Sequence, residues 1–209
     1  MTYVFTELFR ELAIWTTHHC QPFEPTFVAH LLTTTRYEGF LTTVLIYAAS
    51  FRYCDIYLFF FGVGTTVNGL LNVLLRVLVH DERRASPLCF DVYNTSGNWP
   101  SYQTQDSTFI VVFLCTYAVL YRARVDPIAV ALLLICYAGI VAGDLLLNYH
   151  TGSQVAGAVG AGTLCALAWQ FVIRFALLPY VPWLLRLPVV AYFEYTDAMI
   201  AMPGVPKLE

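Results

Sequence analysis

The residues best suited to chemistry lie in the polar segment from Gly143 to Gln154, which follows a long apolar run. The segment carries a carboxylate at Asp144, an imidazole at His150 and an amide at Gln154. An imidazole serves as a nucleophile or as a general acid or base near neutral pH. Polar groups between membrane-type segments cost free energy, so we interpret this cluster as a candidate functional site. If a helix begins at His150, Gln154 follows one turn later on the same face.

Two further patches carry groups that suit an anion. Arg76 and Arg83 supply guanidinium groups, which form paired hydrogen bonds with phosphate. Ser101 follows Pro100 and is a good N-cap for a helix that begins there. The free N–H groups at a helix N-terminus attract anions through their partial positive charge. Together with the histidine, these groups predict a site for a phosphate or diphosphate at headgroup depth.

The composition indicates which kind of scaffold holds these groups. Hydrophobic residues make up 58% of the 209 residues, charged residues only 12%, and the mean hydropathy is +0.63. An average soluble domain has about 25% charged residues. We therefore expect an all-α, polytopic integral membrane bundle that forms a single domain over residues 1–209. The net charge of -3 and the lack of basic stretches interleaved with aromatics argue against nucleic acid as a partner.

The apolar runs predict about five membrane spans, over residues 27–50, 56–79, 101–121, 127–147 and 150–173. The first is interrupted by Arg36 and Glu38, and its clean part, 39–50, is shorter than the roughly 20 residues that cross a bilayer. In the second, Asn68, Asn72 and Arg76 are spaced by four, so they share one helix face near the membrane boundary.

The two ends of the chain predict interfacial segments around the bundle over 27–174. Helical spacing of apolar residues over 3–15 predicts an amphipathic helix within 1–26. At the other end, in 175–209, prolines argue against a straight span and favour short interfacial helices. These prolines are Pro179, Pro182 and Pro188. The aromatic residues expected to act as interfacial anchors are Trp99, Tyr180, Trp183 and Tyr192.

A metal or cofactor is not expected. His18, His19 and Cys20 stand together, but no ligand pattern completes them, so we favour a solvated turn before Pro22 over a metal site. The six cysteines lack metal-ligand spacing, and most fall in apolar runs, so we interpret them as free thiols.

The alternation of spans predicts which segments share a membrane face. The polar loop 80–100 and the segment 143–152 emerge on one side, so the three patches meet there. The arginines that emerge on the other side are Arg52, Arg122, Arg124 and Arg174. This bias places the second face toward the cytoplasm or its topological equivalent.

The order and spacing of these patches resemble the phosphatidic acid phosphatase type 2 superfamily, and its dolichyl-diphosphatase branch most of all. The first family motif is Lys-x6-Arg-Pro, whose positions hold Arg76, Arg83 and Arg84 here. The second is Pro-Ser-Gly-His, matched by Pro100-Ser101-Tyr102-Gln103. The third is Ser-Arg-x5-His-x3-Asp, matched by Gly143, Asp144, His150 and Gln154, and the dolichyl branch also uses Gln at the last position.

The resemblance implies a role for each position. His150 is the ancestral nucleophile, which forms a phosphohistidine in the family, and Gln154 orients its ring. The residues implied to bind phosphate are Arg76, Arg83, Ser101 and Tyr102. Gln103 replaces the general acid and has no titratable proton near neutral pH. Asp144 replaces the arginine that clamps phosphate, and its carboxylate repels the substrate.

These departures favour a protein that retains the scaffold but has lost or strongly reduced catalysis. We expect a structural or accessory subunit of a membrane complex, or a lipid-phosphate-binding protein, with membrane lipids and other membrane-protein subunits as partners. The alternative is an active dolichyl- or polyprenyl-diphosphatase-like enzyme that works through a phosphohistidine at His150. We expect Asp144 to pair with Arg76 or Arg83. The membrane is that of an organelle (endoplasmic reticulum or mitochondrion) or of a virus.

A stripe of small residues follows the histidine segment. It comprises Ala156, Gly157, Gly160 and Gly162. Small residues allow another helix to approach closely, so this stripe predicts a helix-packing surface.

Overall fold

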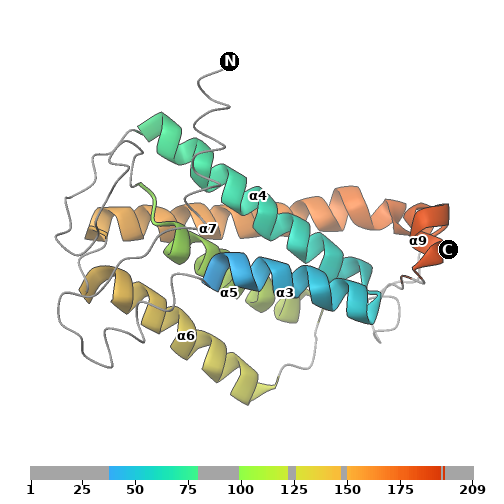
Figure 1. Ribbon diagram of the computed structural model, residues 1–209, viewed down its shortest axis with the longest axis horizontal. Helices are drawn as coiled ribbons and strands as arrows, with labels where there is room; N and C mark the ends of the chain where they lie inside the picture. The colour runs from blue at the N-terminus through green and yellow to red at the C-terminus, as the bar shows by residue number, and fades with distance from the viewer. Residues whose placement is uncertain (1–37, 80–98, 122–125, 147–149, 194, 196–209) are drawn as a thin grey trace.

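The computed structural model describes residues 38–79, 99–121, 126–146, 150–193 and 195. Within these ranges the chain is helical and contains no strand (Figure 1), so the all-α prediction is confirmed. The long helices are α3 (Glu38–Tyr53), α4 (Ile56–Val79), α5 (Tyr102–Tyr121), α6 (Pro127–Leu146) and α7 (Gly152–Val172). Short segments follow: η2 (Ile173–Leu177), η3 (Leu178–Tyr180), α8 (Val181–Leu184) and α9 (Pro188–Tyr192).

Four helices are long and apolar enough to cross a bilayer: α4, α5, α6 and the continuous helix Gly152–Leu184. A helix of 20 residues covers about 30 Å, the thickness of the hydrocarbon core. The protein is therefore an integral membrane protein. Helix α3 has 16 residues, and the stretch 27–37 that was expected to complete its span lies outside the described residues, as does the expected amphipathic helix in 1–26.

Polar residues just before the spans fix where they begin. Asp55 precedes α4, and its Oδ1 accepts a hydrogen bond from the Tyr57 N–H at 2.8 Å. Asp126 precedes α6, and its Oδ1 accepts from the Ile128 N–H at 2.9 Å. These carboxylates satisfy N–H groups that the helix itself leaves without partners. The predicted bounds of α4 agree with the structure, the predicted span at α5 begins one residue too early, and α6 begins at Pro127 as predicted, its predicted end at 147 lying outside the described residues.

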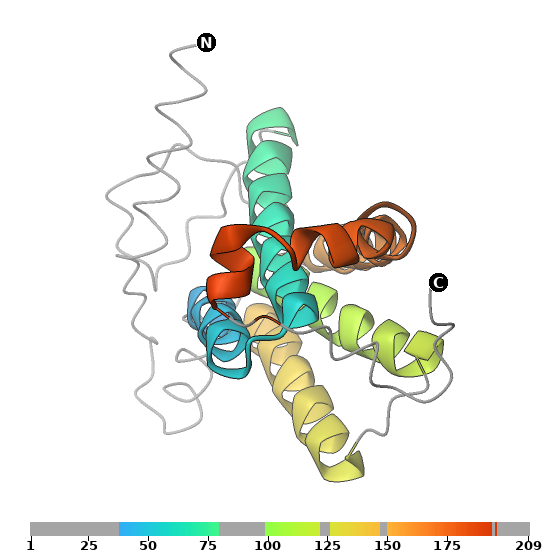
Figure 2. The same ribbon diagram turned by 90° about the vertical axis from the view of Figure 1, so that its right-hand side faces the viewer.

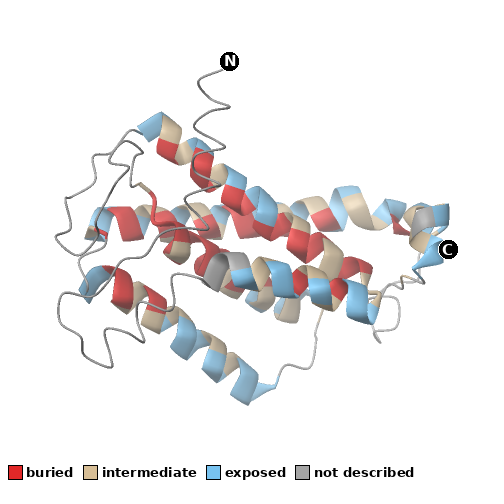
Figure 3. Cartoon of the chain, in the orientation of Figure 1, coloured by how far each residue is buried: buried red, intermediate tan, exposed pale blue. Residues whose placement is uncertain are grey.

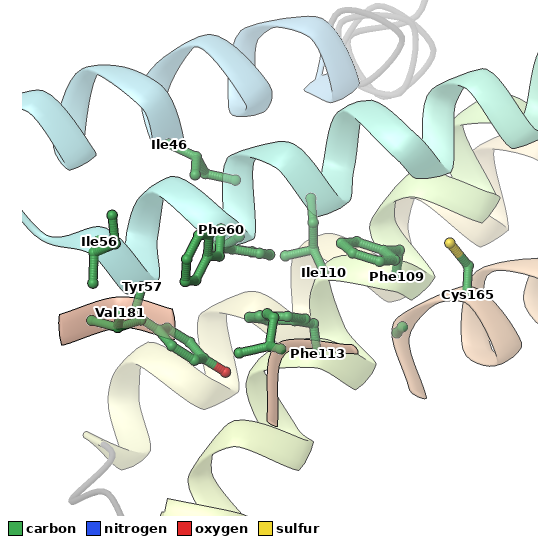
Figure 4. Packing of buried hydrophobic residues seen from close by; sticks show 12 residues of the cluster. Ile46, Ile56, Tyr57, Phe60, Phe109, Ile110, Phe113, Cys165 and Val181 are labelled. Carbon is green, nitrogen blue, oxygen red and sulfur yellow. The ribbon is translucent and has the colours of Figure 1, made fainter. Parts of the chain in front are cut away.

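An aromatic core joins α4, α5 and α7 (Figure 4). The rings of Phe61 and Phe113 stack with centroids 4.5 Å apart, and Phe109 is fully buried beside them. On α7, a Cβ at Gly162 would lie 2.4 Å from the backbone oxygen of Gln105. Helices α5 and α7 thus approach so closely that only glycine fits at position 162.

The predicted small-residue stripe is right in part. A Cβ at Gly157 would lie 2.6 Å from the indole of Trp99, so this position and Gly162 are packing sites. Gly160 faces open space and Ala156 is exposed. Trp99 packs against α7 at Gly157 and is only partly exposed, and its role as an interfacial anchor stays a prediction.

Helix α6 joins the bundle at one end only. Its buried residues are Ile140, Gly143 and Asp144, all near its C-terminus. Figure 2 shows its N-terminal end splayed away from the other helices, and Figure 3 shows exposed residues along most of its length. Asp144, near the end of α6, therefore lies where this helix meets its neighbours.

The C-terminal part of the last helix extends further than expected. The predicted span ends at residue 173, but the helix continues through the π-helical turn η2 and the 3-10 turn η3 to Leu184. Pro179, Pro182 and Pro188 each lie in the first turn of a short segment. The missing N–H is tolerated there, so the first two prolines interrupt the helix less than a proline inside it would.

Candidate functional site

The most distinctive polar contact lies between the end of α6 and the beginning of α5. The Asp144 side chain is nearly fully buried, at 4% exposure, and Ser101 and Thr104 are fully buried. One carboxylate oxygen, Oδ2, accepts hydrogen bonds from the hydroxyl of Ser101 and from that of Thr104, the latter at 2.7 Å. The partial positive charge at the start of α5 stabilises a carboxylate in this position. The hydroxyl groups at the start of α5 therefore donate their hydrogen bonds to a carboxylate of the protein itself.

Backbone hydrogen bonds join the start of α7 to the same place. The Ser101 N–H donates to the Gln154 carbonyl at 3.5 Å, and the His150 N–H donates to the Asp144 carbonyl at 3.1 Å. His150 is buried, with 9% of its surface exposed. The structure thus brings together the second and third motif segments, which lie more than 40 residues apart in the chain.

The start of α7 is a capping box around Thr151. The Thr151 hydroxyl accepts from the Gln154 N–H at 3.3 Å, and the Gln154 side-chain oxygen accepts from the Thr151 N–H at 2.8 Å. This reciprocal pair satisfies N–H groups that begin the helix. Helix α7 begins at Gly152, so His150 precedes the N-cap and is not part of the helix. The expectation that His150 and Gln154 share one helix face required a helix that begins at His150, and this is not what the structure shows. The orienting role of Gln154 stays a prediction.

Asn68, Asn72 and Arg76 share one face of α4, as the spacing of four predicts, and the structure shows that this face packs against α5. Asn68 and Asn72 are buried, and Arg76, one turn further, is 7% exposed. The Asn72 amide donates to the Pro100 carbonyl at 3.3 Å and to the side-chain oxygen of Gln105 at 2.8 Å. Gln105 in turn donates to the Asn68 backbone and side-chain oxygens, at 3.1 and 3.0 Å. Pairing these amides removes the penalty of several kcal/mol for unsatisfied polar groups in hydrocarbon.

Several of these residues were not assigned a role from the sequence. Thr104, Gln105 and Asp106 belong to the polar start of α5, and all three are fully buried. Asp106 accepts a hydrogen bond from the Asn68 amide at 3.3 Å. The signal was the length of the polar run, because consecutive polar residues cover every face of a helix, including the buried one.

The remaining predicted residues are placed as follows. Gln103 lies in the first turn of α5 and is partly exposed, and its backbone oxygen accepts from the Ser107 hydroxyl at 2.8 Å. Tyr102 is buried at 6% exposure. Arg83 lies outside the described residues, so its part in phosphate binding and its pairing with Asp144 stay predictions. Among the described residues, no group of three or more His, Cys, Asp or Glu side chains suits a metal ion.

The arrangement places a carboxylate of the chain itself at the start of α5, which is where a helix can bind an anion. A phosphate at the start of α5 would use the Ser101 hydroxyl and the N–H groups nearby. That hydroxyl donates to Asp144 instead. A second anion would therefore have to displace the carboxylate or lie beside it.

Comparison of the chain with protein-family models, with curated proteins and with solved structures gives no match. The resemblance to lipid phosphatases consequently rests on the three motifs quoted from the sequence. The structure adds that the described residues of these motifs lie at one end of a membrane bundle.

Proposed function

We propose that this protein is a membrane protein on a lipid-phosphatase-like scaffold that has lost catalysis and acts as a structural or accessory subunit of a membrane complex. One observation carries the proposal. The carboxylate of Asp144, at the position where the resembled family holds a phosphate-clamping arginine, accepts hydrogen bonds from Ser101 and Thr104.

The charge at this position opposes the reaction. Two unit charges of the same sign about 4 Å apart repel by about 4 kcal/mol at an effective dielectric constant of about 20. That repulsion equals about a thousandfold in binding or rate. An arginine at position 144 would attract the phosphate and the charge that develops in the transition state, whereas Asp144 repels both.

The residue at the general-acid position adds a second obstacle. Gln103 stands where the resembled family has a histidine that protonates the leaving oxygen. An amide has no proton to give near neutral pH. Loss of a general acid lowers a rate by about two to four orders of magnitude. The two replacements together remove the general acid and one phosphate clamp that a phosphohistidine mechanism at His150 would use.

The polar groups instead support a structural role. Hydrogen bonds of Asp144, Asn72, Gln105 and Asn68 join α6 to the start of α5 and α4 to α5. We propose that the resulting rigid bundle binds other membrane-protein subunits in an organelle membrane (endoplasmic reticulum or mitochondrion) or in a viral membrane.

A phosphate-release assay tests the loss of catalysis. The purified full-length protein, reconstituted in lipid vesicles, receives phosphatidic acid or a polyprenyl diphosphate, and inorganic phosphate is measured over time. We expect no release above that of a matched His150→Ala protein. Release that disappears in His150→Ala would reject the proposal and favour an active phosphatase.

The subunit role has a separate test. Chemical crosslinking in the native membrane, followed by purification and mass spectrometry, identifies neighbouring membrane proteins. We expect a fixed set of partners at constant ratio. A protein that purifies alone after crosslinking would contradict the subunit role but not the loss of catalysis.

A further inference from the structure

The helix that begins with α7 is too long for the hydrocarbon core. It runs from Gly152 to Leu184, 33 residues, which corresponds to about 50 Å. The hydrocarbon core of a bilayer is about 30 Å thick. Arg174 lies about 33 Å along the helix axis from Gly152, near the far boundary of that layer. The residues from 175 to 184 therefore lie at the depth of the lipid headgroups.

This protruding part carries exposed aromatic side chains with polar tips. Tyr180 is 62% exposed, Trp183 is 60% exposed and Tyr192 is 82% exposed. Tyr and Trp favour the membrane interface because their rings are apolar and their tips form hydrogen bonds with water or headgroups. Their exposure supports the anchoring role that the sequence predicts for them.

The segment after α8 returns across the end of the bundle to α3. Figure 2, which views the molecule from this end, shows α8 and α9 crossing in front of α4 toward α3. The rings of Phe193 and Tyr195 contact that of Phe51, with centroids 6.3 and 6.2 Å away. The Tyr195 and Ser50 hydroxyl groups are 3.3 Å apart. These contacts fix the C-terminal segment beside Arg52, the residue that follows Phe51.

Three arginines at this end face outward: Arg52, Arg174 and Arg186 are all exposed. The Arg174 guanidinium lies 5.7 Å from the centroid of the Phe175 ring. The carboxylates described at this end, Asp55 and Asp126, each accept a hydrogen bond from the first turn of a helix. Among the described residues of this end, the positive charges consequently point outward and outnumber the negative ones.

We propose that this end, defined by Arg52, Arg174, Arg186, Tyr180, Trp183 and Tyr192, is a docking surface for anionic phospholipid headgroups of the surrounding leaflet. The arginines bind the lipid phosphates and the aromatic rings lie among the glycerol groups. The surface is opposite the Asp144 end of the bundle, so its lipid binding does not depend on whether the chain hydrolyses lipids.

Competition between lipids tests this surface. The full-length protein in detergent is offered phosphatidylcholine and phosphatidylglycerol in equal amounts, and the bound lipids are counted by native mass spectrometry. We expect a preference for phosphatidylglycerol. Each arginine near an anionic surface contributes about a fivefold preference, so Arg174→Gln with Arg186→Gln lowers it about 25-fold. The matched variant, Arg174→Lys with Arg186→Lys, keeps the charge and the preference.

Two further results decide the proposal if the glutamine variant fails to fold. Raising the salt concentration with the unchanged protein must weaken the preference, because ions screen exposed charges. Soluble glycerol phosphate must fail to displace the lipid, because it lacks the chains that lie beside the aromatic rings. Equal binding of both lipids by the unchanged protein, a salt-independent preference, or displacement by glycerol phosphate would overturn the proposal.

Discussion

The two ends of the bundle are held together by different interactions. At one end, the amides of Asn68, Asn72 and Gln105 and the carboxylate of Asp144 join helices through directional hydrogen bonds. At the other end, aromatic rings join α4 to α5: the ring centroid of Tyr57 lies 4.7 Å from that of Tyr117 and 5.9 Å from that of Tyr121. The same helices, α4 and α5, contribute to both.

The difference shows what each end can specify. Inside a membrane, lipid is as apolar as a leucine side chain, so shape and hydrogen bonds decide which helices associate. Stacked rings tolerate small shifts, whereas paired amides and a doubly bonded carboxylate fix one register. At the polar end, the hydroxyl groups of Ser101 and Thr104 donate to the chain's own carboxylate, Asp144.

The largest expected effect is a gain of activity at the polar end. Gln103→His together with Asp144→Arg restores a proton donor and a phosphate clamp. We expect phosphate release from phosphatidic acid or a polyprenyl diphosphate to rise at least about a hundredfold above that of the unchanged chain. The same double variant carrying His150→Ala is the control and stays inactive. A folded double variant with no gain would mean that the site has diverged beyond these two positions.

The second largest effect is expected at Gly162, where α5 and α7 are in close contact. Gly162→Ala places a methyl group 2.4 Å from the Gln105 backbone oxygen, so α5 or α7 must shift. We expect a loss of about 2 kcal/mol in the free energy of unfolding, measured by denaturation in mixed micelles. At Gly160, where a Cβ meets nothing within 4 Å, alanine leaves stability unchanged or raises it by up to about 1 kcal/mol. Equal effects at both positions would show that the helices are not in this contact.

A loss of stability of similar size is expected when the Asp144 carboxylate is removed. Asp144→Ala leaves the buried hydroxyls of Ser101 and Thr104 without their acceptor. We expect this to lower the free energy of unfolding by about 2 kcal/mol. Asp144→Asn keeps a side-chain oxygen that accepts a hydrogen bond, so we expect its free energy of unfolding to fall by about half as much. An alanine variant as stable as the parent would show that the carboxylate does not join α6 to α5.

The smallest effect is expected at the aromatic end. The Tyr57 hydroxyl donates to the Gln170 side-chain oxygen at 2.9 Å, while the Gln170 amide donates to the Phe113 carbonyl at 3.1 Å. Tyr57→Phe removes one hydrogen bond and keeps the ring, so stability falls by only about 0.6 kcal/mol. Tyr180→Phe, at an exposed site, leaves thermal unfolding unchanged. A loss at Tyr57 as large as that of Asp144→Ala would remove the contrast between the two ends.

The sequence predicts the spans well because their ends carry strong local signals. Asp55 and Pro127 mark the start of α4 and α6, and the spacing of Asn68, Asn72 and Arg76 correctly predicts a shared helix face, which the structure shows to be buried. The path beyond residue 173 was harder to predict. Prolines break a regular helix. Here the chain passes through a π turn and a 3-10 turn into short helices, and each proline lies in the first turn of one of these short segments, where a backbone N–H is not needed.

The candidate site was predictable as a set of segments but not as a set of contacts. Which side chains meet depends on how α5, α6 and α7 pack, and no local pattern contains that information. The hydroxyl of Thr104 therefore went unnoticed as a partner of Asp144, and the capping role of Gln154 was missed. The Ser/Thr-x-x-Gln pattern of Thr151 and Gln154 was a usable signal for the latter.

The most direct test of the central claim is a search for phosphate on His150. The full-length protein is incubated with phosphatidic acid or a polyprenyl diphosphate, kept alkaline to preserve any phosphohistidine, and digested for mass spectrometry. Because the Asp144 carboxylate uses the Ser101 hydroxyl, and Gln103 cannot protonate a leaving group, we expect no phosphorylated His150. A phosphoramidate on His150 that forms with lipid substrate and is absent from His150→Ala would contradict the account.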